Sequence, residues 1–530
     1  MIRGAKAWSD RLLHSALALA GIAVLIVVFG NCAQAFVFPL EIEIKEGTSW
    51  LHVMALEAGV PLYDHHRVAF VNMNHGPMDP LLKYAAHRLL PFLSPAMVTR
   101  FFSLFLPFGI LAAMGRAFGG RWLVAILSSG CVYLFILGLT PFQFLIGRSD
   151  PAALFILSLM LVAADVAAHA IPRGRSVASA RFLAVGLIGS MVILTNWRLF
   201  AFVGGCGCAW AVEAESGGKG KIRDRLASCL CNVGSLALGY LLPFLAVLVV
   251  QFHGNFPVYF LHFFGFFMPD SGCGIGRDIP YSLFPAELVG PRWPAHALLL
   301  IGCGLALALP ARRTPRKLQL LVWLPLLMAL WFSTTYAFFV NHRGGGLYYF
   351  GPFYVIAAFH IARSVDWDRI RIPFLGEGLI ALALLGVPWK AAWGQALFFR
   401  DNMKPAAAFL TEARRLIGAG HAQSEDVYFF EKRYGGEVID IGDSVSLIYP
   451  TGFYGDDFDA TCQRYFDGLQ ARPPRFIMTV GADGGSISVA SPVLRDLVAR
   501  LYTPILVGPD LLWTNGGGRE TLYELKKTVP

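Results

Sequence analysis

The feature that most constrains this chain is a series of long apolar segments, each about as long as a helix that crosses a bilayer. Hydrophobic residues make up 56% of the 530 positions and charged residues only 15%, which is too apolar for an ordinary soluble protein. We therefore predict a multi-span α-helical membrane protein with about 11 transmembrane helices. The candidate spans lie at residues 12–38, 96–114, 121–139, 151–169, 179–196, 198–214, 227–251, 295–310, 318–339, 347–363 and 374–396.

Basic residues in the short loops predict the orientation of the chain, because Lys and Arg concentrate on the cytoplasmic side. The N-terminal segment holds Arg3, Lys6 and Arg11, and the basic loops lie at residues 116–121, 173–181, 219–225, 312–317 and 363–371. We predict a cytoplasmic N-terminus, with the first long loop and the C-terminal segment outside, in a multi-pass protein of a bacterial inner or plasma membrane. The net charge of +9 belongs to the cytoplasmic loops, so we expect no nucleic-acid partner.

The chain divides into two predicted domains. Residues 1–396 form the transmembrane domain, in which the first outer loop, 41–95, carries short interfacial helices at 50–59 and 78–90. Beyond about residue 400 charges recur every few residues, which predicts a soluble α/β domain at 397–530 on the non-cytoplasmic side. In this domain we predict helices at 404–417, 456–469 and 492–501 and strands at 427–431, 475–480 and 522–526.

The cysteines fall into two groups. Most of the nine lie within predicted spans, where a small polarizable side chain packs well. Cys273 and Cys462 fall in outer segments and would pair only in an oxidising compartment. The sequence leaves this disulfide open.

Three carboxylates stand just beyond the first span, at Glu41, Glu43 and Glu46. In an extended segment Glu41 and Glu43 share a face, and Glu46 precedes Gly47, where a substrate can approach the backbone. A carboxylate in a partly desolvated cleft beside the membrane can act as a general base toward a hydroxyl. The alternative is a solvated acidic loop that faces lipid headgroups.

Other polar residues gather on the same predicted face. The first outer loop holds His75 and Asp79, and the segment 147–150 places Arg148 and Asp150 at a membrane boundary, where charges are costly and mark a site. Arg148 suits bidentate contact with a phosphate, and Asp150 can orient it or cap the next helix. The alternative for this pair is a helix cap with an Arg that reaches the interface.

A second basic segment, 341–350, also lies on the predicted outer face. Its three consecutive glycines free backbone amides to hold an anion, and His342 and Arg343 add positive charge. Tyr348 and Tyr349 offer flat surfaces on which a sugar can stack. A tight turn with interfacial tyrosines would use the same residues, so both interpretations stand.

These motifs together resemble the GT-C superfamily of integral membrane glycosyltransferases, which take sugars from polyprenyl-phosphate donors. The resemblance is carried by the Glu46-Gly47 loop with the downstream Gly59-Val60-Pro61-Leu62-Tyr63, by the Gly-Arg-Ser-Asp segment 147–150, and by the glycine-rich turn into Tyr348-Tyr349-Phe350. The predicted architecture agrees over essentially the whole chain. The segment 75–81 departs from the Tyr-Pro-Pro-Leu-like pattern of many members.

The resemblance implies an inverting transfer to a hydroxyl of a glycan, lipid or protein acceptor. The base would be Glu46, with Glu43 second. The donor phosphate would be held by Arg148, His342 and Arg343, and the other substrate contacts would come from Asp150, Tyr348, Tyr349, His75 and Asp79. No cofactor or metal ligand is assigned, although some relatives hold a divalent cation at the phosphate.

Two other classes of function stay open at this stage. A lipid or polysaccharide transporter, or flippase, should carry charged or broken helices near the membrane midplane. A non-catalytic receptor should depend on its outer domain and tolerate substitution of Glu46 and Arg148. The transferase differs from both because Glu46→Gln should then abolish transfer in a protein that still inserts.

Overall fold

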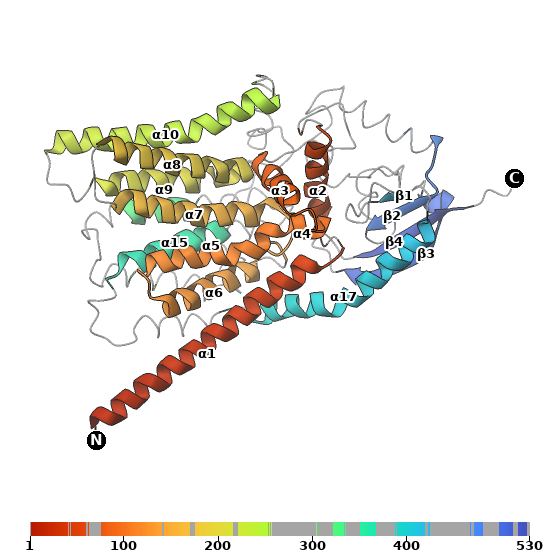
Figure 1. The fold of residues 1–530 in the computed structure, drawn as a ribbon, viewed down its shortest axis with the longest axis horizontal. Coiled ribbons are helices and arrows are strands. Elements are labelled where there is room, and N and C mark those ends of the chain that lie inside the picture. Colours follow the sequence, from red (N-terminus) through yellow and green to blue (C-terminus); the bar gives the residue numbers. More distant parts are fainter. Residues whose placement is uncertain are drawn as a thin grey trace.

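A computed structural model defines the fold, and the parts it describes are mostly helical (Figure 1). Described are residues 2–40, 42, 44–59, 62, 76–139, 142–169, 175–215, 221–252, 254, 256, 301, 304, 322–332, 334, 350–366, 387, 389–418, 422–424, 467, 471–480, 498–511 and 518–526.

Long helices lie side by side in a bundle that forms the body of the molecule (Figure 1). They are α1 (Ile2–Val37), α5 (Phe101–Ala117), α6 (Trp122–Leu139), α7 (Ser149–His169), α8 (Arg175–Thr195), α9 (Phe200–Ala214), α10 (Ile222–Phe252) and α15 (Phe350–Ser364). A short 3-10 turn, η1 (Trp197–Leu199), joins α8 to α9. The main apolar core lies between these helices and continues into the C-terminal sheet.

Membrane-spanning helices are present, as the apolar segments predict. In the part of the chain that the structure describes, four helical segments are long and apolar enough to cross a bilayer: Ser15–Val37, Pro95–Ala117, Ser149–His169 and Ile222–Phe252. Shorter apolar helices at Trp122–Gly138, Ser179–Thr195, Phe200–Ala214 and Val322–Phe332 coincide with further predicted spans. The protein is therefore a multi-pass membrane protein. The number of about 11 stays a prediction, because parts of the later segments lie outside the described residues.

Three short helices cap one end of the bundle: α2 (Ile44–Glu57), α3 (Met78–Leu89) and α4 (Pro95–Thr99) (Figure 1). The sequence predicted interfacial helices here, but α2 begins earlier than expected, so Glu46 lies in its first turn. A carboxylate is favourable there because the helix N-terminus carries partial positive charge. Ser94 caps the N-terminus of α4, and its side chain accepts a hydrogen bond from the Met97 amide.

The C-terminal part begins with a long helix, α17 (Trp389–Ile417), which contains the predicted helix 404–417. This helix runs without a break through the predicted domain boundary at residue 396, so the two-domain division stays a prediction. Its companion sheet lies at the same end of the molecule as α2–α4 (Figure 1). The strands are β1 (Ala422–Ser424), β2 (Phe476–Val480), β3 (Tyr502–Leu511) and β4 (Gly518–Leu525).

The sheet has the order β1-β2-β4-β3. β1 pairs with β2 in parallel, whereas β4 is antiparallel to both β2 and β3. The strands predicted at 475–480 and 522–526 are confirmed as β2 and the end of β4. β3 was not predicted, because it contains Pro504 and Pro509, and proline has no amide hydrogen to donate to a neighbouring strand. The ladder accommodates them at register shifts between Pro504 and Leu506 and between Val507 and Asp510.

A largely buried group of charges, the basal cluster, joins helices at the bundle end remote from α2–α4. It comprises the partly exposed Arg116 together with Asp165, His169, Glu213 and Arg363. The Arg363 guanidinium donates to Asp165 Oδ1 at 3.0 Å and to Glu213 Oε1 at 2.7 Å. Asp165 Oδ2 also accepts from Arg116 Nε at 2.7 Å. The cluster thus ties α5, α7, α9 and α15 together, with Arg363 over the rings of Trp210 and Trp323 as well.

We expect Arg363→Met to lower the free energy of unfolding by about 3–5 kcal/mol, because Asp165 and Glu213 are buried and lose the charge-assisted hydrogen bonds of the Arg363 guanidinium. Thermal unfolding of the purified protein in detergent measures this. The matched control is Arg415→Met, which removes an Arg from an exposed pair with Glu412. Equal shifts in melting temperature for the two variants would contradict a stabilising role for the basal cluster.

Candidate active site

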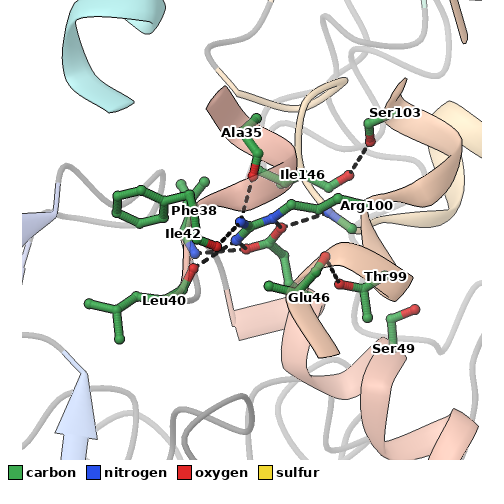
Figure 2. Close-up of polar contacts among 12 residues, drawn as sticks. Ala35, Phe38, Leu40, Ile42, Glu46, Ser49, Thr99, Arg100, Ser103 and Ile146 are labelled. Atoms are coloured by element: carbon green, nitrogen blue, oxygen red, sulfur yellow. Dashed lines mark hydrogen bonds and ion pairs between the residues drawn. The ribbon is translucent and has the colours of Figure 1, made fainter. Parts of the chain in front are cut away.

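The centre of the candidate site is an ion pair between Glu46 and Arg100 (Figure 2). Arg100 Nε donates to Glu46 Oε1 and Nη2 donates to Oε2, each at 2.7 Å. Neither side chain has any exposed surface. Two parallel charge-assisted hydrogen bonds in a dry environment make this the geometry in which an Arg holds a carboxylate most firmly.

Backbone groups occupy the remaining capacity of both side chains (Figure 2). The Ile42 amide donates to Glu46 Oε2 and the Gly147 amide donates to Oε1, both at 2.7 Å. Arg100 donates to three carbonyls at the end of α1 and just beyond it, those of Ala35, Phe38 and Leu40. One ion pair therefore connects α1, α2, the junction of α4 and α5, and the segment before α7.

Glu46 is completely buried, unlike a catalytic acid that is open to its substrate. Every described group bonded to its carboxylate is a donor, and no surface of it is left for an acceptor hydroxyl. Arg100 was not among the site residues predicted from the sequence. It could have been recognised as a charged residue inside the apolar segment 96–114, because a charge within a membrane span needs a partner.

The 147–150 segment lies directly beside this pair. A Cβ on Gly147 would stand 2.7 Å from Thr99 Cβ, so only glycine lets the backbone approach closely enough to reach Glu46. Ser103 Oγ donates to the Ile146 carbonyl at 2.9 Å and holds the same segment from α5 (Figure 2). Arg148 follows, with 11% of its side chain exposed.

Asp150 orients Arg148, one of the two roles considered from the sequence. Its Oδ2 lies 3.3 Å from Arg148 Nε and accepts from Gln143 Nε2 at 2.7 Å. Its Oδ1 accepts from Asn196 Nδ2 at 2.9 Å. Asp150 stands in the first turn of α7, where the helix dipole also favours its charge.

A second buried pair, Asp79 and Lys83, lies in α3 and contacts the same segment. The Lys83 ammonium donates to Asp79 Oδ2 at 2.7 Å, to Ser49 Oγ at 2.6 Å and to the Gly147 carbonyl at 2.8 Å. Asp79 Oδ1 is buried and has no hydrogen-bond partner among the described residues. Asp79 was among the site residues predicted from the sequence, whereas Lys83 was not, because it lies in the predicted interfacial helix 78–90.

The structure therefore brings together three of the predicted site residues, Glu46, Arg148 and Asp150, with Asp79 joined to them through Lys83 and Gly147. The other predicted site residues lie outside the described residues: Glu43, His75, His342, Arg343, Tyr348 and Tyr349. Glu41 and the Cys273–Cys462 pairing lie outside them as well. Within the described part of the chain, no three His, Cys, Asp or Glu side chains gather in a way that could hold a metal ion.

Comparison with known proteins finds similarity in structure. No protein-family model and no curated protein sequence matches this chain. The solved structure of ArnT from Cupriavidus metallidurans bound to undecaprenyl phosphate matches with a TM-score of 0.51 and 14% identity, over 96% of this chain and 98% of that chain. Archaeal oligosaccharyltransferase AglB from Archaeoglobus fulgidus, in complex with an inhibitory peptide and a dolichol-phosphate, matches with a TM-score of 0.44 and 11% identity, over 96% and 75%.

The match to ArnT along almost the full length of both chains shows that this protein has the fold of a GT-C membrane glycosyltransferase. The resemblance read from the sequence is thereby confirmed at the level of the fold.

We expect Glu46→Gln to lower the free energy of unfolding by about 3–5 kcal/mol, because it leaves the Arg100 charge buried and unpaired. The new amide NH₂ would face only donors. Thermal unfolding measures the effect, with Glu57→Gln at the exposed end of the same helix as the control. If Glu46→Gln unfolds at the same temperature as the wild type and Glu57→Gln, the ion pair does not stabilise the fold.

Proposed function

We propose that this protein transfers a sugar from a polyprenyl-phosphate donor to a hydroxyl acceptor, a glycan, lipid or protein, on the extracytoplasmic face of the membrane. The observation that carries the proposal is the convergence of Glu46, Arg148, Asp150 and Lys83 at one end of a bundle with the GT-C fold. Support for the donor class comes from ArnT, which shares this fold and was solved with undecaprenyl phosphate.

The leaving phosphate is the first group that the site must stabilise. Arg148 is the described cation best placed for this, since it is partly exposed and lies beside Asp150, whereas Arg100 and Lys83 are fully buried. His342 and Arg343 are proposed to complete the phosphate contacts, with Tyr348, Tyr349 and His75 beside the sugar and the acceptor. Fixed cations aimed at developing charge lower the barrier by several kcal/mol, because they need no reorganisation during the reaction.

The base is proposed to be Glu43, with Glu46 as the residue that positions it. The Ile42 amide donates a hydrogen bond to Glu46 Oε2, so Glu46 fixes the residue directly before Glu43. In the reaction, Glu43 takes the proton of the acceptor hydroxyl and the hydroxyl oxygen bonds to the anomeric carbon. The bond from that carbon to the phosphate oxygen breaks, its electron pair stays on the polyprenyl phosphate, and the configuration at carbon inverts.

The membrane orientation belongs to the same proposal. Helices α2–α4 and the sheet lie at one bundle end (Figure 1), whereas Arg116 and Arg363 stand in the last turns of α5 and α15 and belong to the basal cluster at the other end. Because Lys and Arg favour the cytoplasmic side, the basal cluster would face the cytoplasm and the candidate site the outside of a bacterial inner or plasma membrane.

Glu43→Gln should bind the donor as the wild type does and release polyprenyl phosphate about 10²- to 10⁴-fold more slowly, the usual contribution of a general base. Native mass spectrometry of the protein incubated with a panel of synthetic polyprenyl-phosphate sugars and candidate acceptors scores both binding and release. Glu57→Gln is the matched control.

The outcomes separate the classes of function. Release at the wild-type rate by Glu43→Gln would remove Glu43 as the base while leaving the transferase in place. Failure of the wild-type protein to bind any polyprenyl-phosphate sugar would instead favour a transporter or a receptor.

A further inference from the structure

Gly147 is held through both of its backbone polar groups. Its amide donates to Glu46 Oε1 at 2.7 Å, and its carbonyl accepts from the Lys83 ammonium at 2.8 Å. Glu46 lies in α2 and Lys83 in α3, so two different helices hold this one residue. The carbonyl belongs to the same planar peptide unit as the Arg148 amide. Lys83 therefore holds the unit from which Arg148 continues.

The Lys83 ammonium uses all three of its donors inside the protein. They go to Ser49 Oγ at 2.6 Å, to Asp79 Oδ2 at 2.7 Å and to the Gly147 carbonyl at 2.8 Å. The Lys83 side chain has no exposed surface, and the Asp79 carboxylate balances its charge. Lys83 can thus affect a bound substrate only through the groups that it holds.

The glycine at position 147 makes the direction of Arg148 depend on this bond. A residue without a Cβ has wide freedom in φ and ψ, so Gly147 does not by itself fix the peptide unit that follows it. Glu46 acts before that unit, on the Gly147 amide. Beyond it, Asp150 Oδ2 lies 3.3 Å from Arg148 Nε and restrains the side chain. Lys83 holds the backbone between these two contacts.

We infer that Lys83 is a positioning residue for Arg148: its ammonium holds the Gly147 carbonyl and so sets the direction in which the Arg148 guanidinium points. The inference deepens the proposed function and rests on it, since that function assigns the donor phosphate to Arg148. Lys83 touches no substrate itself. Without it, the guanidinium would occupy several orientations and the donor would bind more weakly.

The test compares Lys83→Met, which keeps the aliphatic stem and removes the ammonium, with Lys404→Met at an exposed position of α17. Both proteins are purified at full length and assayed with the polyprenyl-phosphate sugar that the wild type binds. The KM for donor and kcat are measured separately. We expect Lys83→Met to raise the donor KM about tenfold, with a smaller change in kcat, and Lys404→Met to match the wild type.

A double-mutant cycle shows whether Lys83 acts through Arg148. In the Arg148→Gln background the guanidinium is absent, so there is nothing for Lys83 to position. We therefore expect Lys83→Met to change the donor KM by less than about twofold in that background. The same increase in both backgrounds would mean that the effect does not pass through Arg148, and it would overturn the inference.

A second control separates positioning from loss of stability. Ser49→Ala removes one partner of Lys83 and keeps its bond to Gly147. We expect this variant to have a lower melting temperature, because a buried hydrogen bond is lost, and a donor KM within about twofold of the wild type. A donor KM raised as much as in Lys83→Met would overturn the inference.

A further variant covers the case in which Lys83→Met does not fold. Lys83→Met combined with Asp79→Leu replaces the whole pair and leaves neither charge buried without its partner. It is compared with Asp79→Asn, which also lacks the carboxylate but keeps the ammonium. Equal donor KM values in these two proteins would overturn the inference.

The result for the wild type separates this inference from the proposed function. A wild type that binds and uses donor, with Lys83→Met equal to Lys404→Met, overturns this inference alone. A wild type that binds no polyprenyl-phosphate sugar overturns the proposed function, and this inference with it.

Discussion

The ion pair between Glu46 and Arg100 is the interaction on which the arrangement of the candidate site depends. Two buried charges are tolerable only when each is fully hydrogen-bonded, because the desolvation penalty is several kcal/mol per ion. This requirement brings the carbonyls beyond α1, the first turn of α2 and the Gly147 amide to one point (Figure 2). The ion pair thereby holds these segments in a single conformation.

Charges at both ends of the same apolar helices explain how the bundle keeps its register. α7 carries Asp150 at one end and Asp165 at the other, and α5 begins beside Arg100 and ends at Arg116. Apolar contacts between helices in a bilayer have little directional preference. By themselves they do little to stop one helix from sliding along another. Ion pairs at the two ends supply that direction and fix the geometry of the candidate site.

Sequence reasoning succeeded where the physical signal is local and failed where it is not. The apolar runs near 96–114 and 151–169 were found because a bilayer imposes a minimum length. Glu46 was recognised as special, yet its buried position was not foreseen, because Arg100 lies 54 residues away. Lys83 was missed since one cation on an amphipathic helix is ordinarily solvated. β3 was missed because prolines usually end strands, whereas this edge strand absorbs them at bulges.

Three properties follow from the sequence alone: this is a multi-span membrane protein, its polar residues gather in a few boundary segments, and it resembles the GT-C superfamily. These properties depend on composition and on short motifs, which neighbouring residues define. The three-dimensional structure adds that Glu46 is completely buried against Arg100 and that Asp150 lies beside Arg148. Each of these depends on a partner that helix packing brings close. The cost of burying a charge is offset only when that partner is in place.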